Sequence, residues 1–247
     1  MLRGLLAVGA VLVLSLHQSP GQERDDRTGS LLLVGGGTTT GAVKRRFLEL
    51  AGGRGAHIVV IPSASALPEA GEASRRFWEQ EGVPVLVLHT TSRAEADAPG
   101  FSRPLRRATG VWIPGGDQAR FMALYGGTQV GREILALYRR GGVIGGTSAG
   151  ASVASRVMPG EAGEGRGLGL LGGVVVDQHF DTRARLARLL RVLSNHPDQL
   201  GLGLDESTGV VIRAGTLTVV GERTVSVCRV GSGPQVYRPG ERIALGR

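Results

Sequence analysis

Apolar runs alternate with helical segments through the first two thirds of this chain, and this alternation constrains the fold more than any other feature. The runs that we expect to be buried strands are LLLVGGG (31–37), HIVVIPSAS (57–65), VPVLVLH (83–89), GVWIPGGD (110–117) and GVIGGTSAG (142–150). We expect helices over residues 40–51, 69–81, 118–140 and 149–156. The pattern predicts an α/β fold with a mostly parallel sheet flanked by helices on both faces.

The last third of the chain continues differently. A strand from residue 173 ends at Asp177, Gln178 and His179, and an amphipathic helix is expected over 181–195. Short strands follow, with tight turns that favour antiparallel pairing: 209–213, 216–220 and 224–230. Without an internal repeat or a second domain, residues 30–247 are expected to form a single domain.

The first residues form a separate region. Arg3 precedes an almost wholly apolar stretch at 4–16, which is shorter than the about 20 residues of a comfortable membrane span. We therefore expect residues 1–18 to be a signal peptide or a short uncleaved anchor, and residues 19–29 to be a linker. The leader predicts an exported protein, secreted or periplasmic.

The net charge of +8 raises the question of nucleic-acid binding. Such a site needs clustered basic residues interleaved with stacking aromatics. Aromatic residues make up only 4% of this chain, and its arginine pairs are spread along the sequence. We therefore expect no nucleic-acid partner and interpret the arginines as mostly solvated helix faces, with a positive field that favours an anionic substrate.

Cys228 is the single cysteine, which excludes an intrachain disulfide and a cysteine metal cluster. It lies in an apolar run predicted to be a strand, away from any sharp turn, so we expect a buried structural residue and not a nucleophile.

Ser148 lies in G-x-S-x-G, the pattern of a nucleophile elbow, at the end of the strand 142–150. The pattern alone is weak here because the chain holds 41 glycines, and a small residue in a tight turn would give the same letters. A serine nucleophile needs a base, and the base needs an orienting acid.

Five histidines are candidates for the base. His17 is in the leader, His57 begins a strand at the wrong end of the sheet, and His196 follows a helix and precedes a proline. His89 and His179 both end strands, where sites of parallel sheets gather. We favour His179 because polar residues and a helix start flank it.

The acid should also come from a loop at a strand end. Asp205 and Glu206 follow the apolar run 200–204, whereas Asp177 is too near His179 along a strand and is better placed to contact substrate. Asp181 is a candidate N-cap of the next helix. The proposed order is Ser148, His179, Glu206, which differs from the acid-before-histidine order of ordinary α/β-hydrolases.

An oxyanion must be held by preorganised N–H donors. Ala149, directly after the serine, is one candidate, and Gly116 in a glycine turn is the other. The run GGGTTTG (35–41) matches neither a P-loop nor a dinucleotide fingerprint, so we expect no nucleotide cofactor.

The segments LLLVGGG, PGGDQ, GGTSAGAS, VVDQHF-x₂-R-x-R and LGLDES, in this order and spacing, resemble the cyanophycinases of peptidase family S51. The resemblance covers about residues 30–230 and is specific in the combination of GGTSAGA with DQHF. It implies a fold related to class I glutamine amidotransferase domains, a homodimer, and no metal or other cofactor. It also implies Ser148 as nucleophile, His179 as base and Glu206 as acid.

The resemblance further implies hydrolysis of cyanophycin, a polyaspartate whose side chains carry isopeptide-linked arginine, to β-aspartyl-arginine. It implies that the substrate site is lined by Gln118, Asp177, Gln178, Arg183, Arg185 and Arg188. On a helix, Arg185 and Arg188 share a face and Arg183 points elsewhere. The alternatives are an aspartyl dipeptidase acting on short peptides and a binding protein that kept the fold without catalysis.

Overall fold

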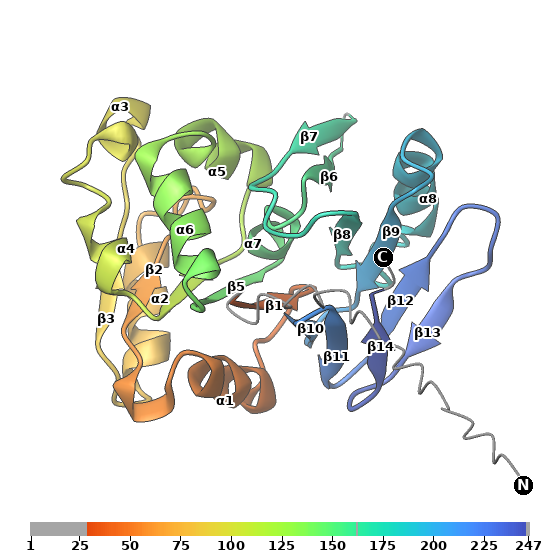
Figure 1. Cartoon of the computed structure of the whole chain (residues 1–247), viewed down its shortest axis with the longest axis horizontal. Helices are drawn as coiled ribbons and strands as arrows, with labels where there is room; N and C mark the ends of the chain where they lie inside the picture. Colours follow the sequence, from red (N-terminus) through yellow and green to blue (C-terminus); the bar gives the residue numbers. More distant parts are fainter. Residues whose placement is uncertain (1–28, 162, 246–247) are drawn as a thin grey trace, which may run out of the picture.

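The computed structural model describes residues 29–161 and 163–245, which form a large mixed sheet, a smaller second sheet and their covering helices (Figure 1). The main sheet has eight strands in the order β14-β11-β10-β1-β5-β4-β2-β3. The second has the order β13-β12-β9-β8, and β6 pairs with β7 in a separate hairpin. The predicted α/β class is confirmed.

The parallel half of the main sheet comes from the apolar runs of the first two thirds of the chain. Its strands are β1 (Ser30–Val34), β2 (Ile58–Val60), β3 (Val85–Val87), β4 (Gly110–Ile113) and β5 (Val143–Thr147). All four pairings among them are parallel, so their carboxyl ends meet at one edge. That edge is where a site is expected in such folds.

Helices cover both faces of this sheet because successive side chains of a strand point to opposite faces. Leu32 and Val34 pack with Phe47 and Trp78, on the face covered by α1 (Gly41–Leu50) and α2 (Ala70–Glu79). Leu31 and Leu33 belong to the core of the opposite face. The helices there are α3 (Arg93–Asp97), α4 (Arg103–Arg107), α5 (Gln118–Tyr125) and α6 (Gln129–Arg139). A 3-10 turn, η1 (Gly53–Gly55), follows α1.

The C-terminal strands contribute to both sheets. Strands β10 (Thr208–Arg213), β11 (Thr216–Gly221) and β14 (Arg242–Ala244) extend the main sheet beyond β1 in antiparallel order. The second sheet contains β8 (Val174–Gln178), β9 (Leu200–Leu204), β12 (Val225–Cys228) and β13 (Gln235–Tyr237). Strands β8 and β9 are parallel, and helix α8 (Leu186–Asn195) packs on them. Cys228 is fully buried in β12.

Three predicted helices have different bounds. The helix expected over 149–156 ends at Ser152. The segment 118–140 is two helices, α5 and α6, separated at Gly126 and Gly127, of which Gly127 has the positive φ of 73° that a helix interior does not allow. The segment 181–195 is helical only from Leu186, because residues 181–185 form turns in which Ala184 has a φ of 48°. The predicted N-cap at Asp181 is therefore wrong: Arg185 precedes the helix, and the Asp181 carboxylate accepts a bond from Arg223 at 2.6 Å.

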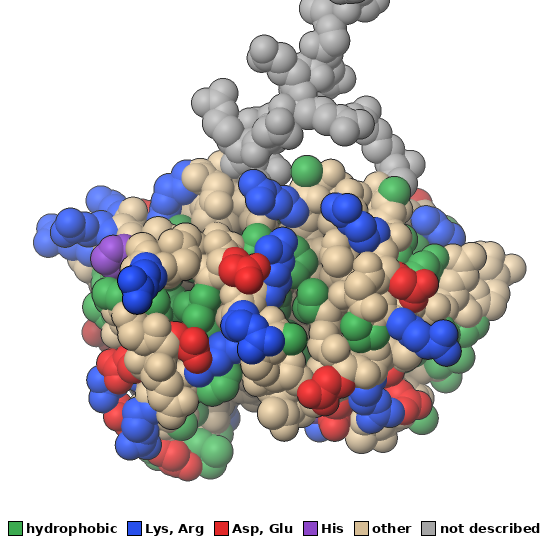
Figure 2. Space-filling view, turned by 90° about the horizontal axis from the view of Figure 1, so that it is seen from below, with side chains coloured by type: hydrophobic (Ala, Val, Ile, Leu, Met, Phe, Trp, Pro, Cys, Tyr) green, Lys and Arg blue, Asp and Glu red, His purple; other side chains and the backbone are tan. Residues whose placement is uncertain are grey.

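Several short segments were not expected from the sequence: helices α3 and α4, the hairpin of β6 (Val157–Pro159) and β7 (Glu164–Arg166), and the strands β13 and β14. The predicted leader at 1–18, and the linker at 19–29 apart from Gly29, lie outside the described residues. Over the part of the chain that is described, no helix has the length and apolar character needed to cross a membrane. On the face in Figure 2, arginine and lysine side chains alternate with acidic and neutral ones.

Candidate functional site

Ser148 occupies a sharp turn between β5 and the short helix α7 (Ala149–Ser152). Its backbone has φ 54° and ψ −116°, an unfavourable conformation for a residue with a Cβ. A strained serine at the end of a parallel strand is the geometry of a nucleophile elbow, and strain of this kind is concentrated at functional sites.

The two glycines of the G-x-S-x-G pattern have steric reasons to be there. A Cβ on Gly146 would come within 3.0 Å of the Gly150 backbone, and a Cβ on Gly150 would come even closer to the Ile113 carbonyl oxygen. The turn can therefore close against β4 only if both positions lack a side chain. This contact favours the nucleophile interpretation of Ser148 over a chance pattern.

His179 directly follows β8, at the end of the second sheet that faces the elbow. Its φ of 50° turns the chain away from the strand direction. Its Nε2 lies 2.9 Å from Ser148 Oγ, and the side chain is 13% exposed. The predicted base and nucleophile are thus in direct contact.

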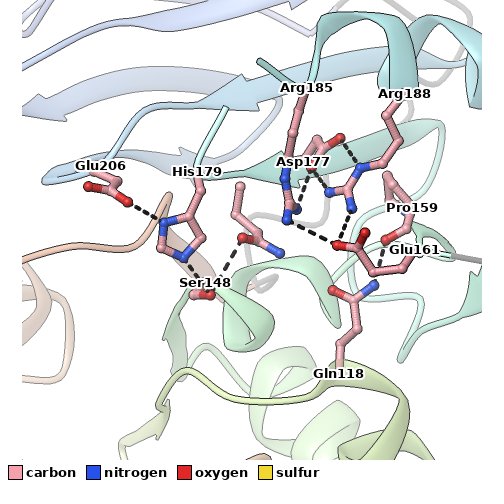
Figure 3. A network of polar contacts seen from close by, with 10 residues as sticks. Gln118, Ser148, Pro159, Glu161, Asp177, His179, Arg185, Arg188 and Glu206 are labelled. Carbon is pink, nitrogen blue, oxygen red and sulfur yellow. Dashed lines mark hydrogen bonds and ion pairs between the residues drawn. The ribbon is translucent and has the colours of Figure 1, made fainter. Parts of the chain in front are cut away.

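Glu206 lies in the turn between β9 and β10, and its Oε1 is 2.5 Å from His179 Nδ1 (Figure 3). Asp205, the neighbouring candidate, is held elsewhere: its carboxylate accepts bonds from Thr224 Oγ1 at 2.6 Å and from the Asp181 N–H at 3.2 Å. The structure therefore brings Glu206, and not Asp205, to the imidazole.

One tautomer of the neutral His179 ring can hydrogen-bond with both Glu206 and Ser148. The hydrogen bond from His179 is the largest cause that lowers the pKa of the Glu206 carboxyl from its ordinary value, outweighing the opposing effect of burial. An ionised carboxylate only accepts, so Nδ1 carries the proton and Nε2 accepts the Ser148 hydroxyl proton. This is the tautomer in which a histidine can act as a general base.

Three consecutive carbonyls at the end of β1 hold these residues together. The Val34 carbonyl accepts the Ser148 N–H at 2.9 Å, and the Gly35 carbonyl accepts the His179 N–H at 2.6 Å. The Gly36 carbonyl accepts the N–H of Ser207, the residue after Glu206, at 2.8 Å. One short backbone segment therefore holds residues from three distant parts of the sequence in fixed positions.

The other described histidines have different partners or positions. His89 Nδ1 lies 2.7 Å from Ser63 Oγ, and that hydroxyl lies 2.6 Å from the Tyr125 hydroxyl. His196 Nε2 contacts Glu164 at 2.8 Å beyond the end of α8, as expected for a helix-end residue. His57 precedes β2, at the opposite end of the strand from its carboxyl edge.

Ala149 directly follows Ser148, and Gly116 lines the same cavity as Ser148, so both oxyanion candidates lie near the serine. Neither of their N–H groups donates a hydrogen bond to another described residue. Gly116 has a φ of 146° and packs on the Ala64 carbonyl, which also accepts the Asp117 N–H at 2.8 Å. The neighbouring Gly115 contacts Ser148, since a Cβ there would lie 3.4 Å from Ser148 Cβ.

A cavity of about 560 Å³ opens beside Ser148. Among the residues that line it are Gly116, Gln118, Ser148, Gln178, Arg183, Arg185, Arg188 and the β6–β7 hairpin. A cavity of about 630 Å³ lies on another side of Arg185, but neither Ser148 nor His179 lines it. The cavity beside the serine is therefore the one in which a substrate could meet the nucleophile.

Asp177, predicted to contact substrate, lies behind this cavity and does not line it. Its side chain is fully buried and accepts bonds from Arg188 Nε at 2.9 Å and from Arg185 Nη1 at 3.4 Å, with a further contact from Arg188 Nη2 (Figure 3). Asp177 thus fixes the two guanidinium groups that face the cavity. Burial, followed by the neighbouring Arg188, lowers the pKa of Arg185.

Arg183 lines the same cavity as Arg185 and Arg188, so the expectation that it would point elsewhere is wrong. That expectation assumed a helix through 183–188, whereas helix α8 begins only at Leu186. Gln178 Oε1 lies 3.5 Å from Ser148 Oγ, and Gln118 Nε2 donates to the Pro159 carbonyl at 2.6 Å. Gln118 therefore ties α5 to the β6–β7 hairpin.

Sequence reasoning missed two residues of this site. Gly36 packs against the imidazole of His179, and Glu161 of the β6–β7 hairpin contacts Arg185 and Arg188. The glycine run after β1 was a visible signal for Gly36. The hairpin carries no sequence signal beyond its glycines.

No group of three or more histidine, cysteine or acidic side chains is gathered as a metal site within residues 29–161 and 163–245. The chemistry that the described groups themselves can provide is nucleophilic attack by Ser148, proton transfer through His179, and recognition of an anionic group by the arginines.

Comparison with known families gives a match to the model of peptidase family S51 over residues 31–220. The chain is 40% identical over 196 residues to a cyanophycinase from Synechococcus elongatus, covering 73% of this chain and 61% of that protein. It is 36% identical over 216 residues to a cyanophycinase from Geminocystis herdmanii, covering 80% and 79%. The match thus spans less than two thirds of the first relative's length.

Among solved structures, the chain resembles a peptidase from an acI-B1 actinobacterium with a TM-score of 0.75 and 26% identity. The superposition covers 88% of this chain and 97% of that protein.

Proposed function

The chain belongs to peptidase family S51, and from this premise we propose that it is a serine exopeptidase that hydrolyses cyanophycin to β-aspartyl-arginine. The supporting names are those of the cyanophycinases to which it is similar. The observation that carries the proposal is the continuous contact from Ser148 through His179 to Glu206, at the mouth of a cavity lined by three arginines.

The first half of the reaction forms an acyl-enzyme. Ser148 Oγ attacks the carbonyl carbon of a backbone peptide bond beside a β-linked aspartyl residue, while His179 Nε2 removes the hydroxyl proton. Glu206 holds the Nδ1 proton and stabilises the imidazolium that forms. The imidazolium then donates its Nε2 proton to the leaving amine as the C–N bond breaks.

The second half releases the acyl group. A water molecule gives one proton to His179 Nε2 and adds to the ester carbonyl. The bond between the acyl carbon and Ser148 Oγ then breaks, and His179 returns the proton to Oγ. In both halves the carbonyl oxygen carries negative charge, and we assign its stabilisation to the N–H groups of Gly116 and Ala149. Each N–H is available in the described structure.

The cavity beside Ser148 would hold the arginine-bearing unit of the substrate. Arg183, Arg185 and Arg188 can bind a carboxylate through parallel N–H donors, and Gln118 and Gln178 offer neutral polar groups. Asp177 then acts through the two arginines that it fixes and not by touching substrate.

The test is to incubate the purified full chain with insoluble cyanophycin and to identify the soluble products by mass spectrometry. We expect β-aspartyl-arginine from the wild type and none from Ser148→Ala. Ser152→Ala is the matched control, because Ser152 is a second buried serine of the same elbow whose hydroxyl has no hydrogen-bond partner among the described residues. It should keep wild-type turnover.

Two results would contradict the proposal. Turnover of cyanophycin by Ser148→Ala would show that Ser148 is not the nucleophile. Cleavage of short aspartyl dipeptides without attack on cyanophycin would identify an aspartyl dipeptidase instead. Labelling of the wild type, but not of Ser148→Ala, by a serine-selective covalent probe would exclude the non-catalytic alternative in either case.

We also propose that the enzyme is exported through residues 1–18 and acts as a homodimer. The proposal of export rests on the apolar leader, and the proposal of a homodimer rests on the family resemblance. Cell fractionation and sedimentation of the purified protein test them separately.

A further inference from the structure

Arg185 and Arg188 lie between two carboxylates that hold them very differently (Figure 3). On the inner side is Asp177, fully buried and bonded to both guanidinium groups. On the cavity side is Glu161, whose Oε1 lies 3.3 Å from Arg185 Nη2 and 3.5 Å from Arg188 Nη1. The Glu161 side chain is 87% exposed.

The outer contact is the weaker one. Solvent screens an ion pair of which one partner is this exposed, and both N···O distances are long for a charge-assisted hydrogen bond. The inner contacts are shielded from water because Asp177 is fully buried. The bond from Arg188 Nε to Asp177, at 2.9 Å, is also shorter than either contact with Glu161, whereas Arg185 lies at a similar distance from both acids. The arginine pair therefore stays on Asp177 when Glu161 leaves, and it is preorganised for another ligand.

The charges of Asp177, Glu161 and the two arginines allow an anionic ligand to bind in place of Glu161. Two guanidinium groups against the single carboxylate of Asp177 leave one positive charge facing the cavity, and Glu161 now balances it. An incoming carboxylate can take the same donors without changing the net charge. Glu161, once displaced, becomes an unpaired acid at the same mouth of the cavity.

Other acids of the cavity are held by local partners. Glu164 accepts bonds from Asn195 and His196, each at 2.8 Å, and these bonds lower its pKa. Asp117 caps α5 by accepting the Ala119 and Arg120 N–H groups. Glu161 is thus the lining acid best able to change partner.

We propose that Glu161 recognises the guanidinium group of the substrate by an exchange of ion pairs. The carboxylate of the substrate's arginine replaces Glu161 on Arg185 and Arg188, and the released Glu161 pairs with the guanidinium of the same arginine. One internal pair is replaced by two pairs to the ligand, which selects a unit carrying both charges. The inference rests on the proposed function and adds a specificity residue to it.

The experiment measures binding by calorimetry in the Ser148→Ala background, where no turnover consumes the ligand. The two ligands are β-aspartyl-arginine and β-aspartyl-alanine, which share their carboxylates and differ in the side chain that carries the guanidinium. We expect S148A to prefer the arginine dipeptide and E161Q to reduce that preference by about tenfold, the size of one charge-assisted contact. Affinity for the alanine dipeptide should stay equal or rise, because E161Q removes the internal competitor.

Two further variants separate recognition from general effects. Glu164→Gln removes an acid from the same hairpin and cavity, but one held by Asn195 and His196, so the preference should be unchanged. Glu161→Asp keeps the charge on a shorter side chain and should restore part of the preference.

Three results would overturn the inference while leaving the proposed function intact: E161Q weakening both dipeptides equally, E161Q tightening both equally, or S148A showing no preference between them although the wild type hydrolyses cyanophycin. If S148A binds neither dipeptide and the wild type releases no product from cyanophycin, the proposed function is wrong, and this inference falls with it.

Discussion

Gly36 lies so close to the ring of His179 that a Cβ on Gly36 would come within 3.0 Å of three ring atoms: Cε1, Nε2 and Nδ1. The glycine also has a φ of 112°, which side chains rarely adopt. The backbone of Gly36 is therefore one wall of the slot that orients the imidazole between Ser148 and Glu206.

Gly36→Ala should lower kcat/KM by a factor on the order of 10² or more, because a displacement of about 1 Å at a reacting group costs that much. The imidazole must move off its line to Ser148 Oγ to make room for the methyl group. Steady-state kinetics on cyanophycin measures the loss.

Gly53→Ala provides the control for backbone strain. Gly53 also has a positive φ, 61°, but a Cβ there meets nothing within 4 Å. It should lose some stability without losing turnover. Equal activity losses in the two variants would show that strain, and not the contact with His179, causes the effect.

Glu206 should contribute to stability in a pH-dependent way. Its pKa is lower in the folded protein than the ordinary value of 4.5, chiefly because His179 donates to the carboxylate. The folded state then binds fewer protons than the unfolded one, so the contribution is present above pH 4.5 and is lost as the pH falls through the folded value.

Urea unfolding of wild type and Glu206→Gln at pH 7, and at several points below pH 4.5, tests this expectation. The wild type should be the more stable at pH 7, and the difference should shrink as the pH falls. Glu222→Gln, at an exposed position after β11, serves as the comparison. A difference that stays constant down to the lowest pH would show that the carboxylate is not stabilised by His179.

Asp177→Asn should destabilise the protein by about 3–5 kcal/mol, because it leaves two guanidinium groups without their buried counter-charge. Glu49→Gln breaks an exposed pair with Arg46 at 2.9 Å and should cost less than about 1 kcal/mol. Denaturant unfolding at neutral pH compares them. A loss in Asp177→Asn no greater than in Glu49→Gln would show that the inner ion pair adds little to folding.

Cys228 should be unreactive in the folded protein. Burial raises the pKa of its thiol to about 11, so at pH 8 only a fraction on the order of 10⁻³ is thiolate, the reactive form. Intact mass after iodoacetamide treatment should show no adduct on native protein and one on denatured protein. Native labelling at the denatured rate would place the thiol at the surface.

The strands of the parallel half follow directly from the sequence because each is specified locally. In β1, Leu31 and Leu33 pack on one face and Leu32 and Val34 on the other, and such uninterrupted apolar runs occur where both faces are covered. The contact of Ser148, His179 and Glu206 was likewise foreseen, since each residue follows a strand.

The features that sequence reasoning missed depend on contacts between distant segments. An apolar run predicts a strand but does not indicate which sheet the strand joins. The separate sheet of β8, β9, β12 and β13 therefore could not be predicted from the sequence. The turns before Leu186 were hidden because the amphipathic pattern continues through them, although the chain must reverse after His179. Gly126 and Gly127 each cost a helix only about 1 kcal/mol, too little to predict the break between α5 and α6.

The position of β1 also bears on when activity can appear during synthesis. This strand is made before the rest of the described fold, yet its two neighbours in the sheet are β5 and β10. The three carbonyls at its end accept hydrogen bonds from Ser148, His179 and Ser207, which are all translated later. A ribosome must therefore translate through Arg213, at the end of β10, before this strand can be paired on both edges. We therefore expect a nascent or prematurely terminated chain to be inactive until β10 has been made, although it already contains Ser148.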